Sequence, residues 1–119
     1  MKTERDDLSE RLLDFAANIV KLAIGLNRTP VGRHIGGQLA RSATSAGANY
    51  EEACGAESRA DFIHKLQLVL KELRESLYWL RLIGKTNITT VSSLDGLVKE
   101  AGELANIVGK SVVTAKKNK

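Results

Sequence analysis

Residues 62–83 read FIHKLQLVLKELRESLYWLRLI, and apolar or small side chains recur in this stretch at alternating intervals of four and three residues. The recurring positions, which we call a seam, are Phe62, Leu66, Val69, Leu73, Ser76, Leu80 and Ile83. In an α-helix this spacing places every seam position along one face. The stretch therefore predicts a long amphipathic helix that packs lengthwise against its neighbours, as helices do in bundles.

Three other stretches repeat the same alternation. Their seams are Leu8, Leu12, Phe15, Ile19, Leu22 and Leu26; then Ile35, Leu39, Ser42, Ala46, Asn49 and Ala53; then Leu94, Leu97, Ala101, Leu104, Val108, Ser111 and Ala115. Four seams joined by short connections predict an all-α fold, because strands would require a period of two residues. Short connections also force neighbouring helices to run antiparallel, so we expect a four-helix bundle with up-down-up-down topology.

The breaks between the seams predict where each helix begins and ends. Thr29 before Pro30 is typical of a helix start, since proline tolerates the first helical position and threonine caps it. Ser58, three residues before Asp61, is a second capping pair, and the hydroxyls of residues 89–93 offer caps for the last helix. We expect a single domain over residues 1–119. Its helices should lie near 6–27, 30–55, 58–85 and 91–115, followed by a basic tail at 116–119.

The composition is that of a soluble globular protein, with 43% hydrophobic and 27% charged residues. No apolar run is long enough for a membrane span, and the N-terminus lacks the apolar core of a secretory signal. The only cysteine, Cys54, is consistent with a reducing compartment, so we expect a cytoplasmic protein that has no membrane partner. The net charge is +4, but three positive residues, Lys116, Lys117 and Lys119, lie in the expected tail. The total charge is therefore weak support for nucleic-acid binding.

The third and fourth helices carry more apolar and small residues than their seams require. These flanking positions are Ile63, Leu70, Leu77, Val98, Gly102, Ala105, Gly109 and Val112. A stripe wider than the seam buries more than one neighbouring helix, so these residues are candidates for a subunit interface in a homo-oligomer. The alternative is that they complete the core of the single chain.

A polar seam follows the opposite flank of the second and third helices. Its members are Arg41, Ser45, Asn49, Glu52, Glu72 and Glu75. Charged groups near a core are costly unless they are paired, so we expect Arg41 to join Glu72 or Glu75 in a structural network that fixes helix register. The alternative is a pocket that serves a small molecule, a metal or an enzymatic reaction. Neither His34 nor His64 follows a glutamate by three residues, as in bundle di-iron sites, so we expect no metal, no cofactor and no catalytic residue.

A basic stripe runs along the outward face of the third helix. It consists of Lys71, Arg74, Tyr78, Arg81 and Lys85. Such a stripe is a candidate for nucleic-acid binding, because lysine and arginine neutralise phosphates and tyrosine can stack on a base. The alternative is an ordinary solvated helix face. In a symmetric oligomer the stripe would recur once per subunit and become a multivalent surface.

The segments RSATSAGANYEEA (41–53), DFI (61–63) and KELRESLYWLRL (71–82) resemble the four-helix-bundle family of 23S ribosomal RNA intervening-sequence proteins. The accessory variability determinants of diversity-generating retroelements are relatives of that family. Its usual motif SIPSNIAEG appears here as SAGANYEEA (45–53), with Ser45, Asn49 and Glu52 kept. The resemblance implies a barrel-like homopentamer; the retroelement relatives are strongly basic, bind nucleic acid and associate with a reverse transcriptase.

The function expected from the sequence is that of a non-catalytic, homo-oligomeric helical scaffold. Its expected partners are copies of itself, with RNA, DNA or a nucleoprotein as the candidate ligand of its basic surfaces. The competing hypothesis is a small-molecule-binding or metal-binding bundle, or an enzyme, that uses the polar seam residues Arg41, Asn49, Glu52, Glu72 and Glu75.

Overall fold

The computed structural model describes residues 3–90 and 92–118, so Met1, Lys2, Val91 and Lys119 lie outside the described residues. Four helices account for most of this chain: α1 (Glu4–Gly25), α2 (Pro30–Cys54), α3 (Arg59–Thr86) and α4 (Leu94–Lys117). The described residues contain no strand, and the prediction of an all-α, four-helix fold is confirmed. Each helix begins and ends within three residues of its predicted bound. One difference is that α4 continues through Lys116 and Lys117, which were expected in a tail.

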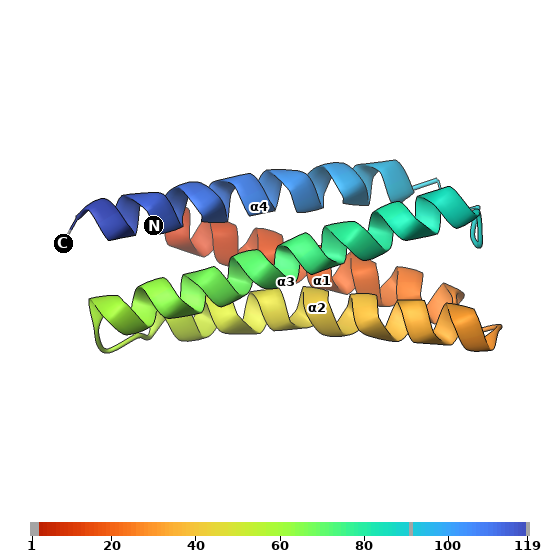
Figure 1. The fold of residues 1–119 in the computed structure, drawn as a ribbon, viewed down its shortest axis with the longest axis horizontal. Coiled ribbons are helices and arrows are strands. Elements are labelled where there is room, and N and C mark those ends of the chain that lie inside the picture. The colour runs from red at the N-terminus through yellow and green to blue at the C-terminus, as the bar shows by residue number, and fades with distance from the viewer. Residues whose placement is uncertain (1–2, 91, 119) are drawn as a thin grey trace.

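The four helices lie along one long axis in a molecule that measures 48 × 27 × 20 Å. Figure 1 shows the α1–α2 and α3–α4 connections at one end, which we call the tip. The α2–α3 connection and both chain ends lie at the opposite end, which we call the basal end. Residues far apart in the sequence therefore meet at each end of the molecule.

Local side-chain bonds define three of the helix starts. Thr3 accepts a hydrogen bond from the Asp6 amide at 3.1 Å, and the Asp6 carboxylate accepts one from the Thr3 amide at 3.2 Å. The hydroxyls of Thr29 and Ser58 cap α2 and α3 in the same way. The start of α4 differs from the expectation, because Ser93 has helical backbone angles and its side chain makes no capping bond.

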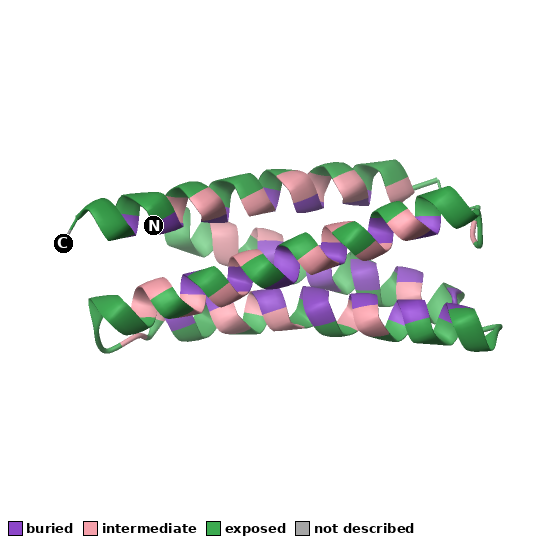
Figure 2. Cartoon of the chain, in the orientation of Figure 1, coloured by how far each residue is buried: buried purple, intermediate pink, exposed green. Residues whose placement is uncertain are grey.

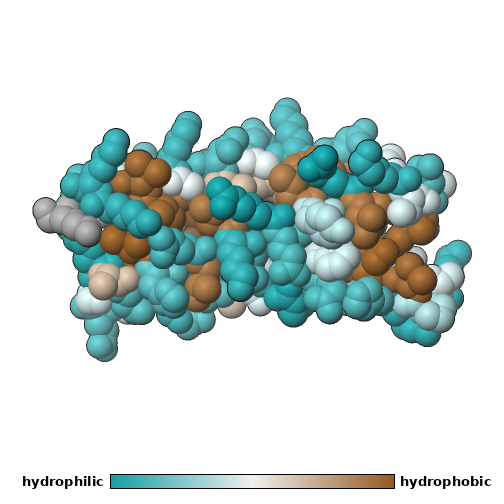
Figure 3. Space-filling view, viewed as in Figure 1, coloured by the Kyte–Doolittle hydropathy of each residue, from teal (hydrophilic) through white to brown (hydrophobic). Residues whose placement is uncertain are grey.

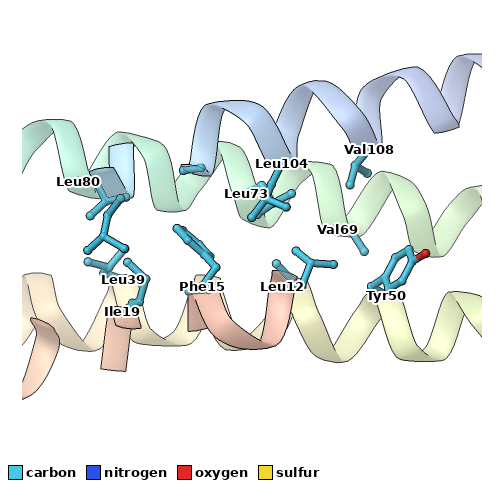
Figure 4. Close-up of a cluster of buried hydrophobic side chains, with 14 of the residues drawn as sticks. Leu12, Phe15, Ile19, Leu39, Tyr50, Val69, Leu73, Leu80, Leu104 and Val108 are labelled. Carbon is cyan, nitrogen blue, oxygen red and sulfur yellow. The ribbon is translucent and has the colours of Figure 1, made fainter. Parts of the chain in front are cut away.

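The core lies where the four seams meet (Figures 2 and 4). Its largest fully buried side chains include Phe15, Leu12, Ile19, Leu39, Leu66, Leu73, Leu80, Ile83 and Leu104. Most predicted seam positions are buried, but two are replaced by the next residue along the chain. Tyr50 and Val112, each 7% exposed, occupy the places predicted for Asn49 and Ser111. A straight helix drifts by about 20° per heptad relative to a strict seven-residue repeat, so residues at the trailing edge of a seam rotate out of the core.

Burial changes the chemistry of Tyr50. Burial, and to a lesser degree the neighbouring Cys54 one turn along α2, raises the pKa of Tyr50 to about 12. The phenol is therefore neutral over the whole physiological range and acts as a core residue.

The bundle is packed unevenly around its circumference. The pairs α2–α3, α3–α4 and α1–α2 pack closely along their lengths, whereas α1 and α4 contact each other much less. Gly32 allows the tight α1–α2 connection, since a Cβ at this position would lie 2.1 Å from the carbonyl oxygen of Leu26. Across the loosely packed side between α1 and α4, Arg11 donates two hydrogen bonds to Glu100, at 2.6 and 3.1 Å. This bidentate ion pair links α1 to α4.

Candidate nucleic-acid interface

All five residues of the basic stripe, Lys71 to Lys85, are exposed on α3. They recur at alternating intervals of three and four residues, so they share one face of the helix. At 1.5 Å per residue, the stripe is about 21 Å long. Among the described residues, no ion pair involves any of its four cations, which leaves their charges available to a ligand.

An aromatic cluster adjoins the stripe. Tyr78 is 59% exposed and packs edge-to-face on Trp79, with ring centroids 5.2 Å apart. Trp79 is half-buried and makes a second edge contact with His34 of α2, with centroids 6.2 Å apart. These perpendicular arrangements are the favoured geometry for aromatic pairs. The cluster connects the exposed face of α3 with α2.

The polar seam contains a closed network around Arg41. Its guanidinium donates to Glu72 at 2.9 Å, to Glu75, and to Gln38 at 3.4 Å. The Trp79 indole donates to the same Glu75 carboxylate at 3.0 Å. Hydrogen bonds from Arg41 and then Trp79 lower the pKa of Glu75 below its usual value, and Glu75 in turn raises the pKa of Arg41. These bonds hold two helices and the aromatic cluster in one register.

Other predicted members of the polar seam lie apart from this network. The Asn49 amide donates to the Ser45 carbonyl at 2.9 Å, within α2. Glu52 pairs instead with Lys65 of α3, at 3.1 Å. The structure thus brings together Arg41, Glu72 and Glu75 and separates Ser45, Asn49 and Glu52 from them.

A bond that we did not predict lies beneath the network. The hydroxyls of Ser42 and Ser76 are 2.7 Å apart and fully buried, so they join α2 to α3 inside the core. The sequence signal was the presence of two serines at seam positions, since a buried hydroxyl needs a partner.

The charges of the chain are unequally distributed between its two ends. The segments at the tip, residues 17–37, 78–90 and 92–99, hold six cations and one aspartate, a net charge of +5. The cations are Lys21, Arg28, Arg33, Arg81, Lys85 and Lys99. The segments at the basal end, residues 3–16, 45–70 and 100–118, sum to −4, and Lys2 and Lys119, which adjoin them in the sequence, bring the sum to −2. Charge sums along the chain missed this separation, because each long helix runs from one end to the other.

The predicted subunit-interface residues occupy several environments. Leu70, Leu77, Val98 and Ala105 are half-buried and pack against the core of the single chain, and Ile63 is half-buried near the basal end. Val112 belongs to the core itself, for the helical drift described above. Gly102 and Gly109 face open space, because a Cβ at either position would meet no atom within 4 Å. We call Leu70, Leu77, Val98, Gly102, Ala105 and Gly109 the α3–α4 face.

A second apolar surface was missed by the sequence analysis. Leu13, Val20 and Ile24 on α1 are 61%, 38% and 70% exposed, and Val31 at the start of α2 is 62% exposed. Beside them, Leu13, Ala16, Thr44, Gly47 and Ala48 line a groove of ≈ 410 Å³ between α1 and α2. We call this surface the α1–α2 face. Its signal was a second alternating run, Leu13, Ala17, Val20 and Ile24, beside the α1 seam.

The face seen in Figure 3 is mostly hydrophilic, with apolar patches between the charged side chains. A hollow of ≈ 710 Å³ lies at the basal end, where Arg5, Glu57, Arg59 and Lys110 contribute charges of both signs. Within residues 3–90 and 92–118, no group of three histidine, cysteine, aspartate or glutamate side chains is placed to hold a metal ion. In the same part of the chain, no helix has the length and hydropathy to cross a membrane.

Comparison with known proteins points to one family. The profile of the family described as 23S rRNA-intervening sequence protein matches residues 6–110. A crystal structure of a protein of unknown function from the S23 ribosomal protein family of Bacteroides thetaiotaomicron VPI-5482 superimposes with a TM-score of 0.84. The two chains are 34% identical, and the match covers 92% of this chain and 98% of that chain. No functionally curated protein matches the sequence.

Proposed function

We propose that this chain, which belongs to the family of 23S rRNA-intervening sequence proteins, is a non-catalytic, homo-oligomeric scaffold that binds nucleic acid along α3. The observation that carries the proposal is the basic stripe. Its four cations are exposed, take part in no ion pair with another described residue, and flank an exposed tyrosine.

The electrostatics of the whole chain support the same ligand. Arg81 and Lys85 belong both to the stripe and to the tip, where the net charge is +5. A local excess of positive charge attracts a polyanion over about a Debye length, on the order of 8 Å at physiological salt, and speeds its association. The negative charge of the basal end does not oppose this, because it lies several Debye lengths from the tip in a molecule 48 Å long.

Self-assembly would bring several basic stripes together on one particle, so that they bind a ligand jointly. A ring of identical subunits requires two different, mutually complementary faces on each chain. The α1–α2 face, with its protruding Leu13 and Ile24, and the smooth α3–α4 face, with Gly102 and Gly109, would provide such a pair. We therefore propose a pentameric ring of up-down-up-down bundles, in which five stripes act together.

The closed network around Arg41 supports a structural role for the polar seam over an enzymatic one. Glu72 and Glu75 are both engaged by Arg41, and Glu75 also accepts the Trp79 indole. A carboxylate engaged in this way is a poor general base, because its charge is already stabilised.

A charge-reversal pair tests nucleic-acid binding. Fluorescence anisotropy with a labelled 12-nucleotide RNA would compare Arg74→Glu with Arg81→Glu, combined in one chain, against Lys116→Glu with Lys117→Glu. Both variants change the net charge equally, so only the location differs. We expect the stripe variant to lose at least about tenfold in affinity and the α4 variant less than about threefold, because the local contacts dominate. Equal losses, or no binding by the unaltered protein at low salt, would remove the proposal.

A further inference from the structure

The stripe alone does not say which form of nucleic acid it would bind, since phosphate contacts carry no information about base pairing. Tyr78 is the feature that does. It lies between Arg74 and Arg81 on the same face of α3, and 59% of its surface is exposed. Proteins that bind single-stranded nucleic acids combine exposed aromatic rings, on which bases stack, with cationic side chains that contact the phosphates. The ring of Tyr78 between two arginines has this arrangement.

The ring is held in place by a chain of contacts that reaches back to the polar seam. Tyr78 packs edge-to-face on Trp79, whose other neighbour is His34 of α2. The Trp79 indole is fixed by its 3.0 Å hydrogen bond to Glu75, and Arg41 engages the same carboxylate. A platform that is already ordered loses less conformational freedom when a base stacks on it.

The spacing of the flanking charges fits a strand that crosses this platform. Arg74 and Arg81 are separated by seven residues, which corresponds to about 10.5 Å along the helix axis. A base stacked on Tyr78 would place its own backbone between the two guanidinium groups. In a duplex, the base faces are covered by neighbouring bases and cannot reach the ring.

We infer that α3 binds single-stranded or looped nucleic acid, with an unpaired base stacked on Tyr78 and the adjoining phosphates on Arg74 and Arg81. The inference rests on the proposed function, because it specifies the ligand of the same stripe. The role of the Arg41–Glu75–Trp79 contacts is then to position the aromatic platform.

Trp79 provides the test, since it is the only tryptophan in the chain and its ring lies 5.2 Å from that of Tyr78. The probes are a 12-nucleotide oligouridylate and a blunt-ended RNA duplex of 12 base pairs, which has no loop. Anisotropy reports binding, and Trp79 emission reports contact at the platform. We expect the oligouridylate to bind more tightly than the duplex and to change the emission, whereas the duplex leaves the emission unchanged.

Variants separate stacking from charge. Tyr78→Ala should weaken oligouridylate binding roughly 5- to 150-fold, the range found for base–aromatic stacking, without altering the dependence on salt. Tyr78→Phe should bind as the unaltered protein does. Arg81→Ala should instead reduce the slope of log K against log salt by roughly 0.7, the contribution of one phosphate contact on a single strand.

The outcomes distinguish this inference from the function on which it rests. Equal binding of duplex and oligouridylate, with Tyr78→Ala neutral, would overturn the inference and leave nucleic-acid binding intact. Absence of binding by both probes at low salt would overturn both. A change in the solution mass of Tyr78→Ala would assign the ring to a contact between copies and would likewise overturn the inference.

Discussion

Glu75 links the polar seam to the aromatic cluster. Its carboxylate accepts hydrogen bonds from Arg41 of α2 and from Trp79 one turn further along α3. Both donors favour the ionised form, which is why the pKa of Glu75 is lowered. A carboxylate with a lowered pKa stabilises the folded state above its unfolded value of 4.5, and this stabilisation is lost as the pH falls through the folded pKa.

Glu75→Gln should therefore lower the free energy of unfolding by about 1 kcal/mol at pH 7, a value discounted for partial solvent exposure. Below pH 4.5 the deficit should shrink, because the carboxylate of the unfolded chain is then protonated and that of the folded protein follows as the pH falls through its lowered pKa. Urea denaturation at pH 7 and at pH 3 would measure both values. Glu57→Gln, at an exposed position in the α2–α3 connection, is the control and should match the unaltered protein. A deficit of the same size at both pH values would show that the stabilisation does not come from the ionised form of Glu75.

At this scale the sequence predicted the partners of Arg41 on the neighbouring helix, but not the pairings of Arg11 with Glu100, of Glu52 with Lys65 or of Ser42 with Ser76. Arg41 was expected beside Glu72 or Glu75, because a guanidinium at the edge of a core needs a carboxylate partner. The local bond from Asn49 to the Ser45 carbonyl was not expected. Its side chain can be satisfied four residues back in its own helix, and a seam pattern does not distinguish that choice from a partner on another helix.

The helices differ in how firmly each is held. α2 and α3 each pack closely against two neighbours, whereas α1 packs closely only against α2 and α4 only against α3, and the α1–α2 contact is the less extensive of these two. The link from α1 to α4 is the ion pair of Arg11 with Glu100, whose side chains are 41% and 29% exposed. α1 should therefore be the first helix to open locally, since local stability follows the number of buried contacts.

Arg11→Ala should accelerate amide hydrogen exchange in α1 while leaving exchange in α3 nearly unchanged. The global cost should be small, about 0.5 kcal/mol, because the pair is partly exposed. Exchange followed by mass spectrometry would resolve the helices. Lys65→Ala, which removes the Glu52 partner between α2 and α3, is the matched control and should not affect α1. Equal amide protection of α1 and α3 in the unaltered protein would contradict the prediction, because it would show that α1 does not open before the other helices.

The helices themselves were predictable because each carries a complete alternating seam and two of them start with a capping pair. How closely each pair of neighbouring helices packs around the bundle was not predictable. A seam shows that a helix has a buried face, but it does not show how tightly α1 approaches α4. The positions of Tyr50 and Val112 were missed for a related reason, since a seven-residue repeat approximates a straight helix for only a few turns.

At the scale of the molecule, the α1–α2 face and the α3–α4 face are the surfaces on which the proposed ring depends. Leu13→Glu combined with Ile24→Glu places charges on the α1–α2 face, where both leucine and isoleucine are more than half exposed in the single chain. We expect this variant to fold, by circular dichroism, and to have a smaller solution mass by light scattering at micromolar concentration. A charge at a subunit contact is costly because it loses water without gaining a partner.

The control for that experiment is Ile88→Glu. Ile88 lies in the α3–α4 connection and is 41% exposed, so the change adds a charge away from both faces. It should leave the mass unaltered. An unaltered protein that is monomeric at micromolar concentration would remove the ring from the proposal, and equal masses for both variants would exclude the α1–α2 face.

The unequal ends of the bundle have a consequence for any ring of this kind. In a ring whose bundles stand along the rotation axis, all subunits point the same way, so every tip lies on one rim and every basal end on the other. Five copies would collect five times the +5 of one tip on a single rim, opposite a negative one. Such a ring would be electrically polar along its axis. A polyanion would approach the positive rim, and at low salt the positive rim of one ring would attract the negative rim of the next.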